Sequence, residues 1–445
     1  MTVAVYTLGC KVNLYESELI ISLLKENNYT LVDFNEKADI YIINTCSVTN
    51  ESDRKDRKII NEAKRKNKEA IIVVTGCYSQ INPESIDADI VLGNKDKSKI
   101  IDLLDDYIKN KKQIKQIYDL TKVEFEKMNI NKFENHTRAF VKVQDGCNAF
   151  CSYCIIPYAR GRIRSKDLNE TIEEVTNLVN NGYKEIVLTG IHTGRYGIDK
   201  NTNLYELLKK LVQIPKIFRI RLSSIEINEI TDEIIELIKK NDIMAKHLHI
   251  PLQSGSDKIL TLMNRKYDID YFVKKIETIR KEIPDISITT DLIVGFPNET
   301  EEDFKDTIKL LNEIKFTKIH TFPYSKRKNT KAASMPNQID GMTKKKRVHE
   351  VLDISNKYEL EFYKSKLNKE YEVVKEERKN GECIGYTSNY IPVILEKNTV
   401  SDIAKIKITE VNSITKVYGK SSWIKNKLTM SQYKLNNKTI NYIII

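Results

Sequence analysis

The sequence lacks the features that assign a chain to the membrane or to secretion. It has no apolar run long enough to span a membrane, and no basic-plus-apolar signal segment follows Met1. It also contains no internal repeat and no low-complexity tract. We therefore expect a soluble, globular, cytoplasmic protein with no membrane partner.

The composition sets the scale and suggests a class of partner. A chain of 445 residues is too long for one ordinary core, so two or three domains are expected. The net charge of +11 favours nucleic acid or another anionic partner. The alternative is a Lys/Asn/Ile-rich bias spread over every domain, and the charge alone does not decide between the two.

Seven cysteines in a cytosolic chain indicate metal or redox chemistry, because cytosolic thiols stay reduced. Cys147, Cys151 and Cys154 form a C-x3-C-x2-C run, and the next cysteine in the chain is Cys383. Iron–sulfur clusters normally take four thiolates, so three would leave one iron open to another ligand. Zinc is an alternative, although it usually takes four N or S ligands. A buried structural trio is disfavoured by polar residues such as Asn148 between the thiols.

This spacing resembles that of the radical S-adenosylmethionine (SAM) enzymes, in which the open iron of a 4Fe–4S cluster chelates SAM. An aromatic residue before the last thiol, here Tyr153, is common in that superfamily. The resemblance implies reductive cleavage of SAM to a 5′-deoxyadenosyl radical. The protein would orient the cofactor, tune the cluster and exclude side reactions.

The first hundred residues alternate between short β-branched runs and helical patterns. Such alternation predicts a parallel sheet covered on both faces. We expect strands at Val3–Leu8, Asp39–Ile43, Ala70–Thr75 and Asp89–Leu92, and helices at Tyr15–Glu26, Ser52–Arg65 and Lys97–Lys109.

Three further cysteines, Cys10, Cys46 and Cys77, each follow the end of one of these strands. Because the carboxyl ends of parallel strands share one edge, thiols more than thirty residues apart in sequence can meet there. Gly9 and Gly76 permit tight turns at this edge. Isolated core cysteines are the alternative, but three at the same structural position favour a second cluster site.

The segments that carry these cysteines sharpen the resemblance. Residues 9–17, 44–49 and 75–77 resemble the amino-terminal domain of the methylthiotransferases, radical-SAM enzymes with an auxiliary 4Fe–4S cluster on three such cysteines. The resemblance implies two 4Fe–4S clusters and SAM as cofactors. Lys11-Val12-Asn13 is similar to the subfamily that acts on N6-threonylcarbamoyladenosine in tRNA; subfamilies for isopentenyladenosine or a ribosomal-protein aspartate read differently there.

A polar, Lys/Asn-rich stretch at 111–137 is expected to be a linker, and strand–helix alternation resumes at Arg138. Six such units predict an incomplete (β/α) barrel, whose active-site loops follow the carboxyl ends of the strands. Expected strands are Ala139–Val143, Glu185–Thr189, Arg219–Ser223, Lys246–Ile250, Ser287–Val294 and Lys318–Phe322. Expected helices are Thr171–Asn180, Asn203–Val212, Asp232–Lys240, Tyr271–Ile283 and Glu302–Ile314.

The loops after these strands carry the unusual residues, and together they suit a zwitterionic, ribose-bearing cofactor. The loop after the second strand is where the superfamily contacts the amino group of SAM. Taken singly, each residue is more typical of a turn or a cap. Ile227 and Asn329 depart from the family pattern, which has proline and glycine there. We expect SAM contacts from Tyr153, Thr189, Gly190, Glu226, Gln253, Asp291 and Gly295.

His247 and His249 alternate on a predicted strand and so point to one side. A metal site is conceivable. No further histidine or acid accompanies them at ligand spacing, so a barrel-lining or hydrogen-bonded role is favoured.

Arginines follow the C-x3-C-x2-C loop directly, and basic residues follow the sixth predicted strand. Arginines can hold phosphates in a bidentate manner, whereas a solvated charged face is the alternative. We expect RNA contacts from Arg160, Arg162, Arg164, Lys326 and Arg327.

After a helix at 342–368, strands are expected at Tyr371–Glu376, Ile391–Glu396 and Asp402–Val411. An all-β tail of this size resembles the TRAM domain, a small barrel of the oligonucleotide-binding kind that would bind the tRNA backbone. A structural cap is the alternative. The expected domains are 1–110 for the amino-terminal sheet, 138–368 for the barrel and 369–432 for the β-barrel, with no role assigned beyond Asn426.

The whole pattern predicts a multidomain α/β protein: a parallel sheet, a partial (β/α)6 barrel and a small β-barrel. The resemblance implies a tRNA methylthiotransferase that modifies C2 of N6-threonylcarbamoyladenosine at position 37, beside the anticodon, and that needs a flavodoxin- or ferredoxin-type electron donor. Alternatives are another adenosine, a ribosomal-protein aspartate, or a non-enzymatic iron–sulfur RNA-binding redox sensor. No catalytic acid or base is assigned, and the oligomeric state is left open.

Overall fold

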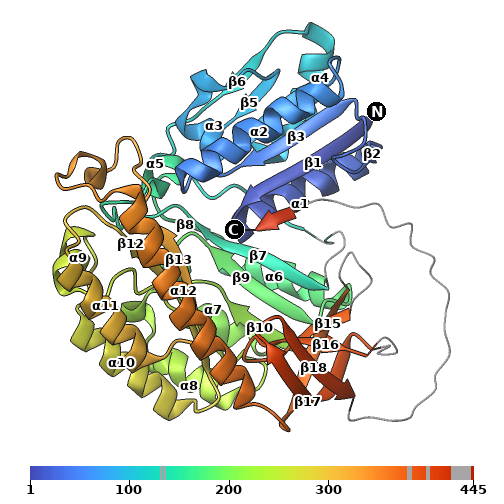
Figure 1. Cartoon of the computed structure of the whole chain (residues 1–445). Helices are drawn as coiled ribbons and strands as arrows, with labels where there is room; N and C mark the ends of the chain where they lie inside the picture. The colour runs from blue at the N-terminus through green and yellow to red at the C-terminus, as the bar shows by residue number, and fades with distance from the viewer. Residues whose placement is uncertain (131–132, 134–136, 378–382, 397–400, 422–441, 445) are drawn as a thin grey trace.

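Three units follow one another along the chain in the computed structural model (Figure 1). The structure describes residues 1–130, 133, 137–377, 383–396, 401–421 and 442–444. Among the helices in these ranges, none has the length and apolar character needed to cross a membrane.

The first unit is a parallel sheet in the order β19-β1-β3-β4-β5-β6, with β2 beside β1. Its elements are β1 (Thr2–Gly9), α1 (Lys11–Glu26), β2 (Thr30–Leu31), β3 (Ile40–Thr45), α2 (Asn50–Lys66), β4 (Ile71–Gly76), α3 (Cys77–Ile81), β5 (Ile90–Leu92), α4 (Ile100–Asn110), β6 (Ile114–Gln116) and β19 (Tyr442–Ile444). Alternate residues of β1 pack into two hydrophobic cores, one on each face of the sheet. Ala4 and Tyr6 pack on the α2 side, whereas Val3 and Val5 pack on the side of α1 and α4.

The second unit is an open arc of six parallel strands, with β8 antiparallel beside β7. Its strands are β7 (Arg138–Asp145), β8 (Arg164–Ser165), β9 (Glu185–Gly190), β10 (Arg219–Leu222), β11 (His247–His249), β12 (Ser287–Val294) and β13 (Lys318–Pro323). Bridges from Ile220 to Met244 and from Ser224 to His249 join its two sheets between β10 and β11. The predicted incomplete (β/α)6 barrel is confirmed.

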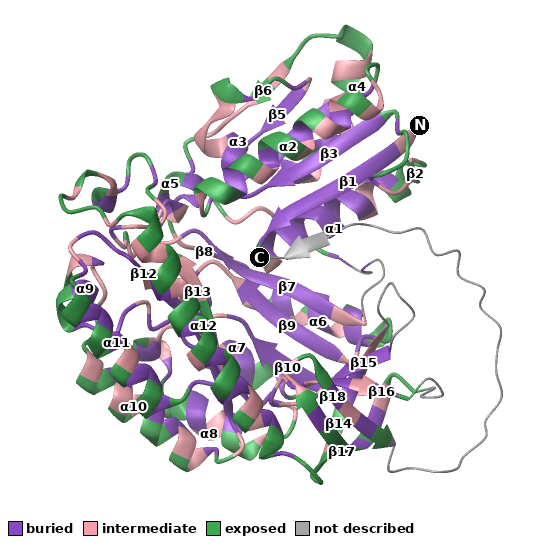
Figure 2. Ribbon diagram, viewed as in Figure 1, coloured by how far each residue is buried: buried purple, intermediate pink, exposed green. Residues whose placement is uncertain are grey.

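Helices cover the outside of this arc, with their outer faces exposed and most strand residues buried (Figure 2). They are α6 (Leu168–Asn180), α7 (Leu204–Leu211), α8 (Asp232–Lys240), α9 (Asp257–Leu262), α10 (Ile269–Glu282), α11 (Glu301–Ile314) and α12 (Gly341–Lys364), whereas the short helix α5 (Ile156–Arg160) lies between the arc and the first unit. Several begin where the sequence offers a capping side chain. Asn203, Thr231 and Thr300 accept hydrogen bonds from backbone N–H groups of the first turns of α7, α8 and α11.

Helix α1 joins the first two units, because it has two apolar faces. Ile20, Ile21 and Leu24 pack on its own sheet. Leu14 and Tyr15 belong to the core of the barrel, and the Tyr15 hydroxyl donates a 2.8 Å hydrogen bond to Glu174 on α6. The two units therefore share a buried interface along α1.

The third unit is a closed barrel of β14 (Glu370–Glu377), β15 (Cys383–Tyr386), β16 (Pro392–Leu395), β17 (Ile403–Ser413) and β18 (Lys416–Ser421). It docks on the amino ends of the central strands. Arg219 Nη1, at the start of β10, donates to the Tyr386 carbonyl at 2.8 Å, and Arg138, at the start of β7, lies 3.1 Å from Glu376. The small barrel is thus at the opposite end of the central strands from the cysteine loop that follows β7.

Some segments differ from the sequence-based expectation. β6 lies inside the predicted linker 111–137 and extends the first sheet by pairing with β5. β19 comes from the tail to which no role was assigned and pairs with β1. β15 and β18 were not predicted, and residues 422–432 of the predicted third domain lie outside the described residues.

Candidate active site at the mouth of the barrel

The N-terminal trio, Cys10, Cys46 and Cys77, stands at one edge of the first sheet. Thr45 and Gly76, which precede the last two cysteines, pair directly across β3 and β4. β1 runs in parallel register with β3, so Cys10 leaves the sheet at the same edge. The expected convergence of three loops from distant parts of the sequence is therefore present in the register of the sheet.

Two glycines allow this close approach. Gly9 has a φ of +106°, and a Cβ built there would lie 3.1 Å from Cys46 Sγ. Gly76 also has a φ of +106°, and a Cβ there would lie 2.4 Å from the Thr45 carbonyl oxygen. Burial raises the pKa of Cys46, and so do the neighbouring thiols of the trio.

The barrel trio, Cys147, Cys151 and Cys154, occupies the loop between β7 and α5. Its thiols meet side chains from other loops of the mouth. Cys147 Sγ lies 3.3 Å from His192 Nδ1, after β9, and Arg265 Nη1, after α9, lies 3.4 Å from Cys151 Sγ. Burial alone would lower the pKa of His192, but hydrogen bonds to Cys147 and Glu229 raise it to about 10.

A buried ionic cluster connects the elements that carry the two trios. Arg160, at the end of α5, lies 2.7 Å from a carboxylate oxygen of Glu16 and donates a 2.7 Å hydrogen bond to Asn13 Oδ1. Lys97 and Lys142 pair with the same Glu16 at 2.9 and 2.7 Å. Burial alone would raise the pKa of Glu16, but the three cations hold it well below its ordinary value.

Two asparagines continue this connection to the cysteines themselves. Asn13 Nδ2 donates to the backbone carbonyls of Leu8 and Thr45 at 2.8 Å each, which ties β1 to β3 beside the N-terminal trio. Asn94 Nδ2 lies 3.5 Å from Cys77 Sγ and donates to the Ala159 carbonyl on α5 at 2.9 Å. Helix α5 therefore stands between the two trios and contacts the loops of both.

The residues predicted to contact SAM lie in loops and strand ends of the same mouth. Glu226 follows β10 and pairs with Arg265 at 2.8 Å, so it is one side chain away from Cys151. Thr189 and Gly190 end β9 beside β7. Ile227, where the resemblance leads one to expect proline, begins a short 3₁₀ turn and is buried in the barrel core. That these residues bind SAM stays a prediction.

The other predicted SAM contacts lie on or beside β12. Asp291 on β12 pairs with His249 at 3.1 Å, and Gln253 hydrogen-bonds through its backbone to β12. The Gly295 N–H donates to Glu299 at 2.6 Å, and the aliphatic part of Lys344 covers Gly295.

Tyr153 packs against the small apolar cluster around Met263 and Phe296. His192 and Arg265 were not assigned by the sequence. His192 stands in a segment that the pattern singled out, whereas Arg265 carries no local signal, since only the fold brings it to Cys151.

Lys11 reaches from the first turn of α1 into the barrel. Its ammonium lies within electrostatic range of Arg138, Glu185 and Arg221, on β7, β9 and β10, and of Tyr390 from the third unit. Within the described part of the chain it forms no ion pair and no hydrogen bond. Burial lowers its pKa, and the two arginines act in the same direction.

Histidines line the same interior. His247 and His249 both hydrogen-bond to Thr289 Oγ1, at 3.1 and 2.9 Å, and the rings of His249 and His320 are 5.7 Å apart. Both His247 and His320 lie within electrostatic range of Lys11. The favoured barrel-lining role of His247 and His249 agrees with these contacts, and the interior that they line is polar and rich in cations.

Three of the predicted RNA-binding arginines are buried, and an RNA-contacting role for them is wrong. Arg160 pairs with Glu16 in the buried ionic cluster. Arg164 Nη1 donates to the Arg160 carbonyl at 2.8 Å. Arg327 pairs with Asp53 at 2.8 Å beside the N-terminal trio. Arginines in a polar run were predicted to be surface groups. Here the guanidiniums of Arg160 and Arg327 satisfy buried acceptors of distant segments, and that of Arg164 satisfies a backbone carbonyl of its own run.

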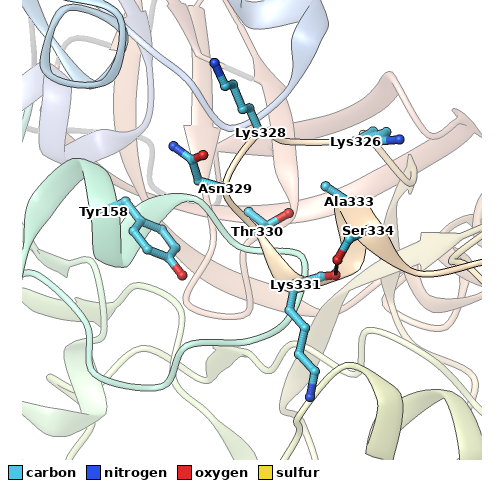
Figure 3. A pocket seen from close by; sticks show the side chains of 8 residues that line it. All are labelled: Tyr158, Lys326, Lys328, Asn329, Thr330, Lys331, Ala333 and Ser334. Atoms are coloured by element: carbon cyan, nitrogen blue, oxygen red, sulfur yellow. Dashed lines mark hydrogen bonds between the residues drawn. The ribbon is translucent and has the colours of Figure 1, made fainter.

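Arg162 and Lys326 are exposed, so their predicted contact with RNA stays open. Lys326 belongs to a loop that lines a hollow of about 760 Å³, with Tyr158 from α5 on its other side (Figure 3). Asn329 in this loop has a φ of +71°, which explains why glycine is usual there in the family. The basic hollow beside the open end of the barrel can bind a polyanion.

Two aromatic residues of the small barrel are engaged with the central barrel. Tyr386 and Tyr390 stack on one another with centroids 5.1 Å apart, and Arg138 lies 4.5 Å from the centroid of Tyr386. Arg221 lies 4.3 Å from the centroid of Tyr390. These rings hold the small barrel against the central one.

The donor sets fit iron–sulfur clusters. All six cysteines are free thiols, and each trio gathers soft sulfur donors on loops of one edge. Among the described residues, no three His, Cys, Asp or Glu side chains are grouped closely enough for a single metal ion. A cluster spaces its thiolates more widely, because each thiolate binds a different iron.

Comparison with known proteins gives the same three-part division. The radical SAM superfamily profile matches residues 141–311, that of the uncharacterized protein family UPF0004 matches 2–93, and that of the TRAM domain matches 364–419. The radical SAM methyltransferase TsrM from Kitasatospora setae has a TM-score of 0.54 at 13% identity and covers 75% of this chain and 74% of its own. At that identity the similarity shows the fold alone.

Closer relatives match along almost the full length. Threonylcarbamoyladenosine tRNA methylthiotransferase MtaB of Bacillus subtilis is 44% identical, covering 92% of this chain and 93% of that protein. MtaB of Aquifex aeolicus is 40% identical, covering 88% and 96%. The tRNA-2-methylthio-N(6)-dimethylallyladenosine synthase of Thermoanaerobacter pseudethanolicus is 35% identical, covering 92% and 90%. On these identities, the chain belongs to the methylthiotransferase family of radical SAM enzymes.

Proposed function

We propose that this protein is a tRNA methylthiotransferase that replaces the C2 hydrogen of N6-threonylcarbamoyladenosine, at position 37 beside the anticodon, by a methylthio group. One observation carries the proposal: two trios of free thiols flank α5, and the ionic cluster around Glu16 and Arg160 fixes the elements that carry them. An unactivated aromatic C–H is not replaced by ordinary acid–base chemistry. A reaction chamber with two sulfur-ligand sets suits a radical route.

Each set of residues has a separate task. The barrel trio would hold the cluster that, with SAM bound, supplies reductive cleavage, and the N-terminal trio would hold the auxiliary cluster that supplies sulfur chemistry. His192 and Arg265 contact Cys147 and Cys151 and orient the thiols of the barrel trio. Glu226, paired with Arg265, is proposed to contact SAM.

The interior of the barrel supports this nucleoside over the dimethylallyl one. The threonylcarbamoyl group carries a carboxylate, whereas a dimethylallyl group is apolar. Lys11 offers an ammonium with no ion-pair partner, and Arg138 and Arg221 add positive charge around it. Arg138 and Arg221 have carboxylate partners of their own, Glu376 and Glu185. An apolar substituent would leave the Lys11 ammonium without an ion-pair partner in a low-dielectric chamber. We therefore assign to Lys11 the recognition of the substrate carboxylate.

Nucleosides from a deletion strain test the substrate. If tRNA from that strain keeps its 2-methylthio-N6-threonylcarbamoyladenosine, the proposed substrate is wrong. An anaerobic assay with SAM and reductant tests the class of protein. A redox sensor without enzymatic activity would form no 5′-deoxyadenosine, whereas the proposed enzyme forms it.

A Lys11→Gln variant tests the role of Lys11 in substrate recognition, because it removes the positive charge of the side chain and keeps most of its length. We expect kcat/KM for tRNA bearing threonylcarbamoyladenosine to fall roughly 10- to 100-fold, since a charge-assisted hydrogen bond is lost. Lys109→Gln, on the exposed surface of α4, is the matched control and should not change the rate. The iron content shows whether Cys10, the next residue, still holds its cluster. Unchanged kinetics with full iron would remove Lys11 from substrate recognition.

Reductive cleavage also needs an electron from outside the chain. We propose a flavodoxin- or ferredoxin-type donor, because such proteins are acidic and this chain has a net charge of +11. The rate of 5′-deoxyadenosine formation with such a donor should fall as ionic strength rises. A rate that does not depend on salt contradicts this partner.

A further inference from the structure

Two aromatic side chains stand exposed beside the barrel trio. Phe150, between Cys147 and Cys151, is 46% exposed, and Tyr158 on α5 is 47% exposed. Their rings meet edge to face, with centroids 5.9 Å apart and planes at 83°. Large apolar groups that pair with one another in open solvent, next to an active site, indicate a surface meant to be covered.

Phe150 has an unfavourable backbone conformation. Its φ is +47°, in the left-handed region that a bulky residue rarely adopts. Asn264 Nδ2 holds this geometry by donating to the carbonyls of Ala149 and Phe150 at 3.2 Å each. Strain that is held in place by a side chain from another loop is typical of functional positions.

Tyr158 lines a hollow beside the barrel trio, and lysines line the opposite side of it. Figure 3 shows Lys326, Lys328 and Lys331 spreading from one loop, with Tyr158 facing the loop across the space. All three lysines are exposed, and the hollow measures about 760 Å³. This volume is sufficient for a nucleotide, since ligand pockets for small molecules are typically about 300–1,000 Å³.

The loop that carries the lysines is fastened to both cysteine-bearing domains. The Ala332 N–H donates to the Ser152 carbonyl, inside the barrel trio, at 2.7 Å. Arg327 donates to Ser47 Oγ, next to Cys46, at 2.7 Å. The hollow therefore stands at a fixed position relative to the two cluster sites.

We infer that this stacking seat, formed by Phe150, Tyr158, Lys326, Lys328 and Lys331, binds a nucleotide of the anticodon loop that flanks the modified adenosine. The inference rests on the proposed function. Bases in single-stranded loops stack on exposed aromatic rings, and lysines neutralise the phosphates on either side. With the neighbouring base held outside the barrel, the target adenosine can turn inward, toward the two cluster sites.

Tyr158→Ala tests the stacking. We expect the Kd for tRNA bearing threonylcarbamoyladenosine to rise about 5- to 150-fold, the range for losing one base–aromatic stack. Tyr158→Phe keeps the ring and should bind close to the unaltered protein. Tyr271→Ala removes an aromatic that is 43% exposed on α10 and serves as the matched control. Iron content and the thermal midpoint confirm that each variant is folded.

The salt dependence of binding tests the lysines. A Lys326→Gln, Lys328→Gln, Lys331→Gln variant should reduce the slope of log Kd against log salt by about 2, since each contact to a single-stranded phosphate contributes about 0.7. Tyr158→Ala should weaken binding at every salt concentration and leave the slope unchanged.

Three outcomes overturn the inference and are separable. If Tyr158→Ala binds tRNA as tightly as the unaltered protein, the seat does not stack a base. If the triple lysine variant binds tRNA normally but is reduced more slowly by a flavodoxin-type donor, the lysines bind that acidic protein instead. If the unaltered protein binds and modifies no tRNA, the proposed function itself has failed.

Discussion

The two cysteine trios hold the same kind of donor set by opposite means. The barrel trio lies within eight residues of one loop, 147–154, so the local sequence alone sets the spacing of its cysteines. The N-terminal trio spans 68 positions, from Cys10 to Cys77, and exists only because three strands are paired in one register. A locally encoded site depends on its loop, whereas a register-encoded site depends on the sheet and on every contact that sets the sheet.

The difference extends to the groups around the thiols. The barrel trio is met by single side chains from neighbouring loops, His192 and Arg265. The N-terminal trio is also met by a side chain, that of Asn94, but its loops approach so closely that a Cβ on Gly9 or Gly76 would collide with Cys46 or Thr45. We therefore expect the two sites to fail separately, and the following variants test that expectation.

Replacing one cysteine in each trio should have the largest effect. Cys151→Ala should abolish both 5′-deoxyadenosine formation and thiolation, because cofactor cleavage needs the barrel trio. Cys10→Ala should retain 5′-deoxyadenosine formation and lose thiolation. Each variant should hold about four iron atoms per chain, against about eight in the intact protein, if both clusters are cubes. Loss of both activities in Cys10→Ala would mean that the sites do not divide the labour.

Glu16→Gln should be the most destabilising change between the sites. It leaves Lys97, Lys142 and Arg160 with too little negative charge in a buried cluster. We expect the free energy of unfolding to fall by roughly 3–5 kcal/mol, as when one partner of a buried ion pair is removed. Denaturant unfolding of the anaerobic protein measures it. Glu236→Gln, which breaks an exposed pair on α8, is the control and should cause no measurable change.

Gly76→Ala should affect only the register-encoded site. Gly182→Ala is its matched control, since Gly182 has a φ of +100° but no atom within 4 Å of a built Cβ. The added methyl of Gly76→Ala meets the Thr45 carbonyl, so we expect about 1–3 kcal/mol of destabilisation beyond the control. Iron should be lost from the N-terminal trio alone. Equal effects in the two variants would mean that backbone strain, not crowding beside the cysteines, explains the glycine.

The sequence predicted most of the regular elements, because their burial is visible as periodicity. β12 and α8 begin and end where expected, and the other five parallel barrel strands differ by a few residues at most, whereas the two-residue strand β8 was missed. Short strands such as β6, β15 and β18 were missed or taken for linker. Three residues of β6 hold no periodic signal, and its pairing with β5 depends on a partner elsewhere in the chain.

The polar residues were harder to place than the apolar ones. Arg160, Arg164 and Arg327 stand in basic runs that are typical of a nucleic-acid face, yet all three are buried. Nothing local distinguishes them from the exposed Arg162. Their acceptors, such as Glu16 and Asp53, come from distant segments, and a guanidinium is buried only where such acceptors are supplied.

The sequence by itself determined the order of the domains, the spacing of the three cysteines of the barrel trio and the position of each cysteine of the N-terminal trio at the end of a strand. Those features depend on near neighbours in the chain, through hydrophobic period and spacing. Only the tertiary structure decided which charges face inward, that Lys11 enters the barrel, and that α5 separates the two trios. Such outcomes depend on pairings between residues from distant segments of the chain, and charge compensation in a buried interface leaves no periodic trace in either partner.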